Sequence, residues 1–355
     1  MILAPGADSD YARGELVRLC APQVVAGLGP RRPRRAARGE ETMNDVSRRQ
    51  WLRTAGTLGV AAAAAGTATA QSRPSADELV RTVKGARLFD LSFTWNEQSP
   101  VLSLNPPYSF ALNRTHRMTH EIFGQVPGSR VSWASEIMYF SGQHGAPTID
   151  AIGHIGRDLK LHGGVDAVAA TSTPGGIGNN LGIDNFPADL MVNRVVFLDV
   201  ARQIASGRPD PLAPSFEVTA THLDQTAKAQ GVEVRRGDSL LIRTGWGQYF
   251  AKDNAKYLGE QSPGPGQDAA RWIIDKGVRL AGDDTATFEK RPAAYGKELF
   301  SVHMMLLADN GIYIVENANL EPLGDAKAYV ALLILTPLRI QGASGSPLRA
   351  IALTP

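Results

Sequence analysis

A short polar segment, residues 143–154, holds the densest set of side chains that could bind a metal. His144, Asp150 and His154 are spaced six and then four residues apart. Gly, Ala and Pro between them predict a loop or a strand-to-loop transition. Because both spacings are even, an extended stretch would point all three side chains to one side. Two imidazoles and a carboxylate are good ligands for zinc or manganese. The alternative is two ordinary surface histidines and a turn aspartate.

A histidine and a glutamate follow later in the chain, on two consecutive predicted elements. His303 lies near the start of a predicted helix over 300–310, and Glu316 ends a predicted strand over 312–315. A strand fixes a carboxylate at its end while the next loop opens to solvent, which suits a functional group. A capping or core role for His303 and a solvated strand end for Glu316 are the alternatives. Asp283, Asp284 and Glu289 could approach the same site or be surface acids.

The elements that must position these residues alternate between strands and helices. Short apolar runs predict strands over 87–93, 132–140, 194–200, 239–244, 278–281, 312–315 and 329–335. Helices are predicted over 219–230, 267–276 and 300–310, and glycines 231, 277 and 311 end them. This alternation predicts an α/β architecture with at least one mixed sheet.

Composition excludes several classes of protein. The 355 residues are 43% hydrophobic and 20% charged, which is globular composition and not that of a disordered chain. The sequence lacks a strongly apolar run of about 18 residues, which argues against a multi-span membrane protein. Cys20 is the only cysteine, so an internal disulfide and a cysteine zinc site are both excluded. Any metal must use His, Asp or Glu.

The first 70 residues have the pattern of a leader. Arg48-Arg49, an Ala/Gly-rich apolar run over 54–65 and Ala68-Thr69-Ala70 together predict a twin-arginine export signal over 43–70, and hence a periplasmic protein. Residues 1–42 are interpreted as an upstream translation artefact or a disordered leader, and Met1 and Met43 both stay open as the start. The alternative for 43–70 is an amphipathic helix that begins a domain. Residues 71–355 are predicted to form a single domain.

Most of the basic excess lies in this leader. Ten of the 37 Lys and Arg and six of the 35 Asp and Glu precede residue 71, so the remainder carries a net charge of −2 against +2 for the whole chain. A balance of this kind does not favour nucleic acid or an anionic membrane as a partner. The expected partner is a small-molecule substrate.

Taken in order, these segments resemble the cyclase family of metal-dependent hydrolases, whose members include kynurenine formamidase and isatin hydrolase. Residues 144–154 are similar to its pattern His-x-Gly-Thr-His-x-Asp-x-Pro-x-His. The further segments that carry the resemblance are 88–92, 176–183, 194–200, Gly237 to Trp246 (GDSLLIRTGW), His303 to Leu320, and 337–347. Together they cover nearly all of residues 86–354.

The resemblance implies a fold, an activity and a set of site residues. The fold is a swivelling β/β/α-type α/β fold, with a mixed, barrel-like sheet flanked by helices, in a homo-oligomer that is a dimer or tetramer. The activity is hydrolysis of an amide, formamide, lactam or lactone, for which zinc or manganese activates water and a histidine moves protons. His144, Asp150, His154 and Glu316 match metal positions, and His303 and His154 match catalytic histidines.

One departure from the family pattern bears on the metal count. Thr148 stands where the family has its second histidine, and a hydroxyl is a poor zinc ligand. One ion held by His144, Asp150, His154 and Glu316 is chemically sufficient. Two ions would need another ligand, such as His162 or Gln143. A non-enzymatic periplasmic protein that binds a small ligand through a degenerate site is the alternative function.

Overall fold

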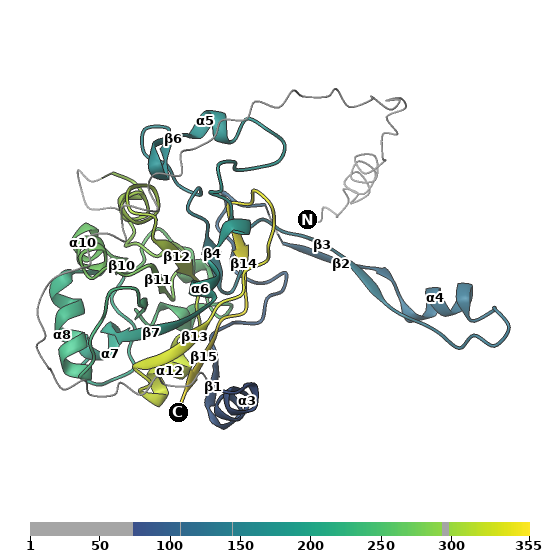
Figure 1. Cartoon of the computed structure of the whole chain (residues 1–355), viewed down its shortest axis with the longest axis horizontal. Helices are drawn as coiled ribbons and strands as arrows, with labels where there is room; N and C mark the ends of the chain where they lie inside the picture. The colour runs from purple at the N-terminus through teal and green to yellow at the C-terminus, as the bar shows by residue number, and fades with distance from the viewer. Residues whose placement is uncertain (1–73, 107, 144, 293–297) are drawn as a thin grey trace, which may run out of the picture. The chain divides into compact units, whose positions relative to one another are not determined.

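A computed structural model describes residues 74–106, 108–143, 145–292 and 298–355 (Figure 1). The predicted export signal and His144 lie outside the described residues, so both stay predictions. Within those ranges, no helix combines the length and apolar character needed to cross a bilayer.

The main sheet has nine strands in the order β1-β15-β13-β7-β9-β11-β12-β4-β14. Its strands are β1 (Arg87–Asp90), β4 (Thr148–Asp150), β7 (Val192–Asp199), β9 (Ser239–Arg243), β11 (Leu280–Asp283), β12 (Tyr313–Glu316), β13 (Val330–Ile334), β14 (Gly345–Pro347) and β15 (Ile351–Thr354). The four strands from β7 to β12 run parallel, and their neighbours on both sides are antiparallel. The predicted mixed α/β sheet is therefore confirmed.

The parallel strands are joined by helices because parallel neighbours need a crossover. The α-helices in the described ranges are α3 (Ala76–Gly85), α4 (His116–Phe123), α5 (Ala167–Ala170), α6 (Ala188–Met191), α7 (Val200–Ile204), α8 (Ala220–Gln230), α9 (Asn254–Tyr257), α10 (Gln267–Asp275), α11 (Ser301–His303) and α12 (Glu321–Ala326). Thr219 caps the start of α8, and Gly231 ends it with a φ of 66°, as its sequence pattern predicts. The crossover helices α8 and α10 lie together on the left of the sheet in Figure 1.

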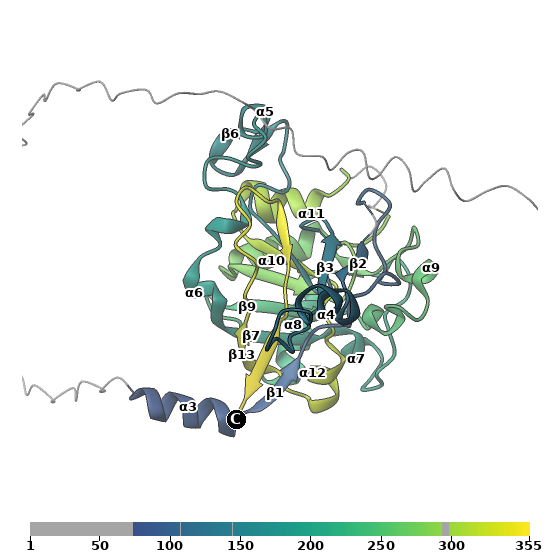
Figure 2. The same cartoon turned by 90° about the vertical axis from the view of Figure 1, so that its right-hand side faces the viewer.

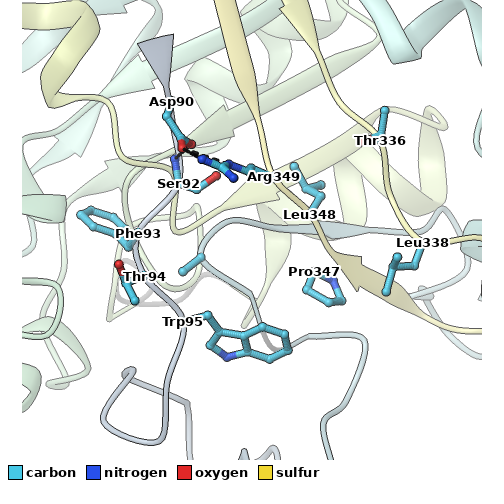
Figure 3. Close-up of a pocket in the computed structure, with 11 residues that line it drawn as sticks. Asp90, Ser92, Phe93, Thr94, Trp95, Thr336, Leu338, Pro347, Leu348 and Arg349 are labelled. Carbon is cyan, nitrogen blue, oxygen red and sulfur yellow. Dashed lines mark hydrogen bonds and ion pairs between the residues drawn. The ribbon is translucent and has the colours of Figure 1, made fainter. Parts of the chain in front are cut away.

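The sheet curls, as the predicted barrel-like core requires. Strands β1 and β14 are its two outermost strands. Nevertheless, Asp90 at the end of β1 and Pro347 of β14 line the same groove (Figure 3). Every residue of β9 and β11 is buried, so the middle of the sheet forms the core. Strand β12, which pairs with β11, ends at Glu316, one of the candidate metal ligands.

A separate two-stranded arm was predicted only in part. Strand β2 (Ser109–Arg114) and strand β3 (Ser135–Tyr139) pair antiparallel, and α4 lies in the segment that connects them. The pattern over 132–140 predicts β3 but not its partner or the helix. In Figure 1 the arm extends to the right, away from the main sheet. Two further two-stranded sheets are small: β8 (Glu217–Val218) with β10 (Gly264–Pro265), and β5 (Lys160–Leu161) with β6 (Val165–Asp166).

Candidate metal centre

Asp150, His303 and Glu316 converge at one buried point. Strands β4 and β12 are paired neighbours, with Asp150 opposite Ile314 and Glu316 opposite Thr148. Because opposite residues and alternate residues share a face, the two carboxylates project to the same side of the sheet. Helix α11 brings His303 to them. One ligand atom from each of the three residues lies within 4.8 Å of the others, and all three residues are buried.

A fourth residue, Glu289, orients the imidazole of His303. Its Oε1 lies 2.9 Å from His303 Nδ1, and its Oε2 accepts a hydrogen bond of 2.8 Å from the backbone N–H of Val302. His303 Nε2 consequently faces the other two acids, at 3.2 Å from Glu316 Oε1 and 3.8 Å from Asp150 Oδ2. A histidine held by a carboxylate through one nitrogen and free to ligate through the other is a frequent arrangement at metal sites.

The carboxylates of Asp150 and Glu316 bring negative charge into a buried site, and a bound cation would balance this charge. Burial, together with the negative charge of Asp150, raises the pKa of Glu316 to about 7. Burial alone would lower the pKa of His303, but its hydrogen bonds to Glu289 and Glu316 raise it well above its usual value. Both carboxylate oxygens of Asp150 are buried and lack a hydrogen-bond partner among the described residues. Buried polar atoms of this kind normally have a partner, and two carboxylates with an imidazole suit a divalent metal.

His154 lies beside this group of three, at the wall of a cavity. Its Nδ1 is 3.3 Å from the side-chain nitrogen of Gln143. Burial lowers the pKa of His154, although Asp150 acts in the opposite direction, so a neutral imidazole is favoured near pH 7. A neutral histidine next to a cavity can accept a proton.

The cavity has a volume of about 210 Å³ and has polar and apolar walls. Its polar side contains His154, His303 and Glu316. The other lining residues are Pro100, Val101, Leu102, Leu104, Asn105, Gln143, Gly145, Ile155, Ala286, Thr287, Phe300 and Asn317. An enclosure of mixed polarity fits a small organic molecule with a few polar atoms.

The hydroxyl of Thr148 makes hydrogen bonds to the backbone, which is a structural role and not that of a metal ligand. It is fully buried, and its hydroxyl lies 3.0 Å from the carbonyl oxygen of Gly142 and 3.3 Å from that of Ser346. The hydroxyl therefore links β4 to the preceding loop and to β14. Of the two extra ligands considered from sequence, Gln143 lines the cavity, whereas the Nδ1 of His162 donates to the carbonyl of Ala308.

The acidic cluster noted in the sequence lies inside the protein. The backbone N–H and hydroxyl of Thr285 both donate to Asp283, and burial raises the pKa of Asp283 well above its usual value, with Asp284 adding to the effect. Asp284 accepts hydrogen bonds from the backbone and hydroxyl of Thr244. Neither acid is a surface residue. Glu289 does approach the site, one of the two possibilities that the sequence left open, through its contact with His303.

Comparison with known proteins identifies the family. The Cyclase family model matches residues 89–290, more than half of the chain. Isatin hydrolase of Roseibium aggregatum is 31% identical over 180 residues, 48% of this chain and 65% of that protein. Kynurenine formamidase of Bacillus cereus is 32% identical over 142 residues, 39% of this chain and 62% of that protein. The matches thus span less than two thirds of the length of these relatives.

The fold comparison agrees with the sequence comparison. The crystal structure of a novel cyclase superimposes with a TM-score of 0.68 at 27% identity, over 78% of this chain and 91% of that one. The architecture, the buried Asp-His-Glu group and the match over residues 89–290 lead to one conclusion: this chain belongs to the cyclase family of metal-dependent hydrolases.

Proposed function

We propose that the protein hydrolyses a non-peptide C–N bond of a small molecule, in an amide, a formamide or a lactam, with a lactone as a related substrate. The observation that carries this proposal is the buried carboxylate of Asp150, which faces His303 and Glu316 without a hydrogen-bond partner among the described residues. The relatives named isatin hydrolase and kynurenine formamidase support the choice of bond.

Asp150, His303 through Nε2, and Glu316 would hold a divalent metal, zinc or manganese. His144 stays predicted as an additional ligand, whereas the second role predicted for His154, proton transfer, is the one that we assign to it here. When bound, such an ion lowers the pKa of a coordinated water and polarises a carbonyl group. Glu289 keeps His303 Nε2 directed at the two carboxylates. Because both nitrogens of His303 are engaged in this way, we assign it to metal binding in preference to the proton transfer expected from the sequence.

His154 would then be the residue that moves protons. Its lowered pKa keeps the ring neutral and able to accept a proton at pH 7. Nδ1 lies beside Gln143, so proton uptake at Nε2 requires the tautomer with the proton on Nδ1 and the amide oxygen of Gln143 turned toward it. The imidazolium formed in this step can return the proton to the leaving nitrogen. The cavity walls around it orient the substrate and limit access of bulk water.

The test combines metal analysis with a substrate screen. Protein purified without chelators should contain zinc or manganese, and the loaded protein should hydrolyse at least one compound in a panel of formamides, lactams and lactones. His154→Gln should keep its metal and lose most turnover. Protein that binds neither metal under any loading condition would contradict the proposal.

A second function has one observation in its favour. Thr148 replaces a family histidine, and its hydroxyl is fully engaged by two backbone carbonyls. A site with fewer ligands could bind a small molecule without turning it over. Metal-loaded protein that binds members of the same panel in calorimetry, but hydrolyses none, would favour this binding protein over the enzyme.

We also propose export to the periplasm by the twin-arginine route. The support is Arg48-Arg49, the Ala/Gly-rich run and Ala68-Thr69-Ala70, all in the sequence alone. Replacing both arginines with lysine should leave the protein in the cytoplasmic fraction. Undiminished recovery from the periplasm would contradict this route.

A further inference from the structure

Asn317 lines the metal cavity immediately after the candidate ligand Glu316, and its side chain has no part in the metal site described above. The residue is only 7% exposed. Its backbone N–H donates to the carbonyl oxygen of Thr285 at 2.8 Å, and the N–H of Ala318 donates to that of Asp283 at 3.1 Å. These two hydrogen bonds tie the turn after β12 to the chain that leaves β11. The backbone therefore holds Asn317 at a fixed place on the cavity wall.

A buried tyrosine holds one end of the Asn317 side chain. Tyr257 Oη donates a hydrogen bond of 2.8 Å to Asn317 Oδ1. Tyr257 is fully buried, its ring meets that of Phe250 edge-on with the centroids 5.4 Å apart, and the indole of Trp246 donates to its carbonyl oxygen. Figure 2 shows α9, the helix that ends at Tyr257, at the right-hand edge of the body and away from β7 and β9. The tyrosine thus approaches Asn317 from outside the main sheet.

The hydrogen bonds of Tyr257 decide which end of the amide is the oxygen. A phenol has one proton to donate, and Asn317 Oδ1 at 2.8 Å is closer to Tyr257 Oη than the carbonyl oxygen of Asp284 at 3.3 Å. Burial also raises the pKa of Tyr257 well above its usual value, so the phenol keeps this proton near neutral pH. We therefore place Oδ1 toward Tyr257 and Nδ2 at the other end of the amide. If the proton went to Asp284 instead, the amide would turn and present Oδ1 to the cavity.

The nitrogen end of the amide is the part left for a bound molecule. In the described ranges no residue accepts a hydrogen bond from Nδ2, and this atom is not among the unpartnered polar atoms that are sealed inside the protein. Because Asn317 lines the cavity, Nδ2 is accessible from that space. Asn105 is a second amide on the wall, but none of the described residues forms a hydrogen bond with its side chain. Asn317 therefore presents a donor whose direction is set before a substrate binds, as electrostatic catalysis requires.

We propose that Asn317 Nδ2 donates a hydrogen bond to the carbonyl oxygen of the bond that is cleaved. The proposal rests on the hydrolase function proposed above and adds a residue to it. When the oxygen of water bonds to the carbonyl carbon, the π electrons of the C=O bond move onto the carbonyl oxygen, and one proton of the water passes to His154. When the C–N bond breaks, these electrons re-form the C=O bond, and the nitrogen takes the bonding pair and leaves with the proton from His154. The hydrogen bond from Nδ2 is strongest between these two steps, while the oxygen carries the negative charge.

The location of Asn317 matches the place where this charge forms. A carbonyl carbon attacked by water has to lie close to both the candidate metal ligands and His154. Asn317, Glu316 and His154 line one cavity of about 210 Å³. The described wall of that cavity includes no lysine or arginine that could take the same role. A directed amide N–H is therefore a contribution that the chain itself makes to stabilising the oxyanion.

The competing explanation is that Asn317 serves the backbone only. Its φ of 57° lies in the left-handed region, where asparagine is common and glycine is free of strain. If conformation were the sole requirement, Asn317→Gly would be a harmless change. The donor role makes the opposite prediction, because glycine keeps the turn and removes the amide. Asn179 offers the matched control, since its φ is 55° and it is exposed and does not line the cavity.

The first experiment measures steady-state kinetics of the full-length, zinc-loaded protein on its best substrate in the formamide, lactam and lactone panel. Asn317→Gly should lower kcat about 100-fold, the lower end of the range for loss of one oxyanion donor. Its KM should change less than about threefold, because the carbonyl oxygen gains its charge only on the way to the transition state. Zinc affinity in calorimetry should not change, and Asn179→Gly should keep the wild-type kcat. A kcat of Asn317→Gly within about threefold of the wild-type value would overturn the proposal.

Two further variants test how the donor is held. Asn317→Asp is nearly isosteric and still accepts the hydrogen bond from Tyr257, but it presents an oxygen to the cavity, so it should lose kcat as Asn317→Gly does. A fully active Asn317→Asp would show that position 317 acts as an acceptor, which would overturn the donor. Tyr257→Phe keeps the packing and frees the amide, so kcat should fall at least about 10-fold with zinc affinity unchanged. An unchanged kcat in Tyr257→Phe would overturn the role of Tyr257 as a positioning residue.

A binding measurement separates failure of this proposal from failure of the proposed function. If the zinc-loaded wild type binds panel compounds but hydrolyses none, the hydrolase function is wrong, yet a donor to the carbonyl oxygen would still be lost in Asn317→Gly. Affinity for those compounds should then fall about 2–10-fold, the effect of one neutral hydrogen bond. Unchanged affinity would overturn the donor on its own. A wild type that neither binds nor hydrolyses any panel compound would overturn both.

Discussion

Replacing Asp150 by asparagine should stabilise the metal-free protein while weakening its affinity for metal. Asp150 and Glu316 present like charges no more than 4.8 Å apart. Two unit charges at that distance repel by about 1 kcal/mol in water and by about 3.5 kcal/mol at an effective dielectric constant of 20. Removing the Asp150 charge relieves this repulsion and the cost of burying a carboxylate without a hydrogen-bond partner, but it also loses the attraction to a protonated His303, whose Nε2 lies 3.8 Å away. We therefore expect the free energy of unfolding to rise by about 1 kcal/mol and the melting temperature by about 2–4 °C.

The assay is thermal unfolding at pH 8 in EDTA, above the Glu316 pKa of about 7, followed by calorimetric titration with zinc and manganese. Metal affinity should fall at least about 100-fold, because even residues behind the ligands change it 10–100-fold. Asp199→Asn is the control, since Asp199 is equally buried but accepts hydrogen bonds from Arg202 and Arg243. Breaking that ion pair should cost about 3–5 kcal/mol.

The two variants differ in the sign of their effect, which makes the reasoning easy to refute. If Asp150→Asn lowers the melting temperature of the metal-free protein as Asp199→Asn does, then the Asp150 carboxylate has a stabilising partner. In that case the argument that its oxygens await a cation is wrong.

Three further perturbations test the surroundings of the site. Glu289→Gln removes the charge that orients His303 and should weaken metal binding about 10–100-fold, whereas Glu298→Gln, an exposed acid paired with Arg157, should not change it in calorimetry. Thr148→His adds an imidazole opposite Glu316. It should lower the melting temperature in EDTA and tighten metal binding, and unchanged affinity would show that position 148 does not face the ion. The metal-free protein should lose stability from pH 5 to pH 8, because the folded-state pKa values of Glu316 and His303 are both raised, and in this range the unfolded chain releases protons that the folded protein holds more tightly. A melting temperature in EDTA that rises over this range would contradict the assigned shifts.

The parallel core could be predicted from the sequence, because it depends on local patterns. Continuous apolar runs gave β7 and β9, and the helix before Gly231 begins and ends within a residue of its predicted bounds. The predicted helix over 300–310 is present as α11 followed by a π-helical turn, Met304–Asp309. The start of β11 falls two residues after its predicted position, since the turn at Gly277 continues further than its sequence indicates.

The arm and the contacts inside the site could not be predicted in this way. Every residue of strand β2 is exposed, and the alternation of its sequence is limited to Phe110 and Leu112, which is too short to indicate a strand. Asp150 and Glu316 meet because β4 pairs with β12 over a separation of more than 160 residues, which no local pattern encodes. The even spacing within 144–154 would place all three side chains on one side only in an extended stretch, but the strand is limited to Thr148–Asp150, and His154 lies in a bend that follows it.

The ladder between β4 and β12 bears on how the protein acquires its metal. Backbone hydrogen bonds of the main sheet hold Asp150 and Glu316 in place, and a large apolar core supports that sheet. Folding therefore need not wait for metal, in contrast to small zinc domains that are unfolded without it. A preformed site of oxygen and nitrogen ligands takes whichever ion is supplied, since affinity alone selects poorly among divalent metals. If the chain leaves the cytoplasm already folded, it would bind its ion there. The identity of that ion would then depend on the metals available in the cytoplasm and not on those in the periplasm.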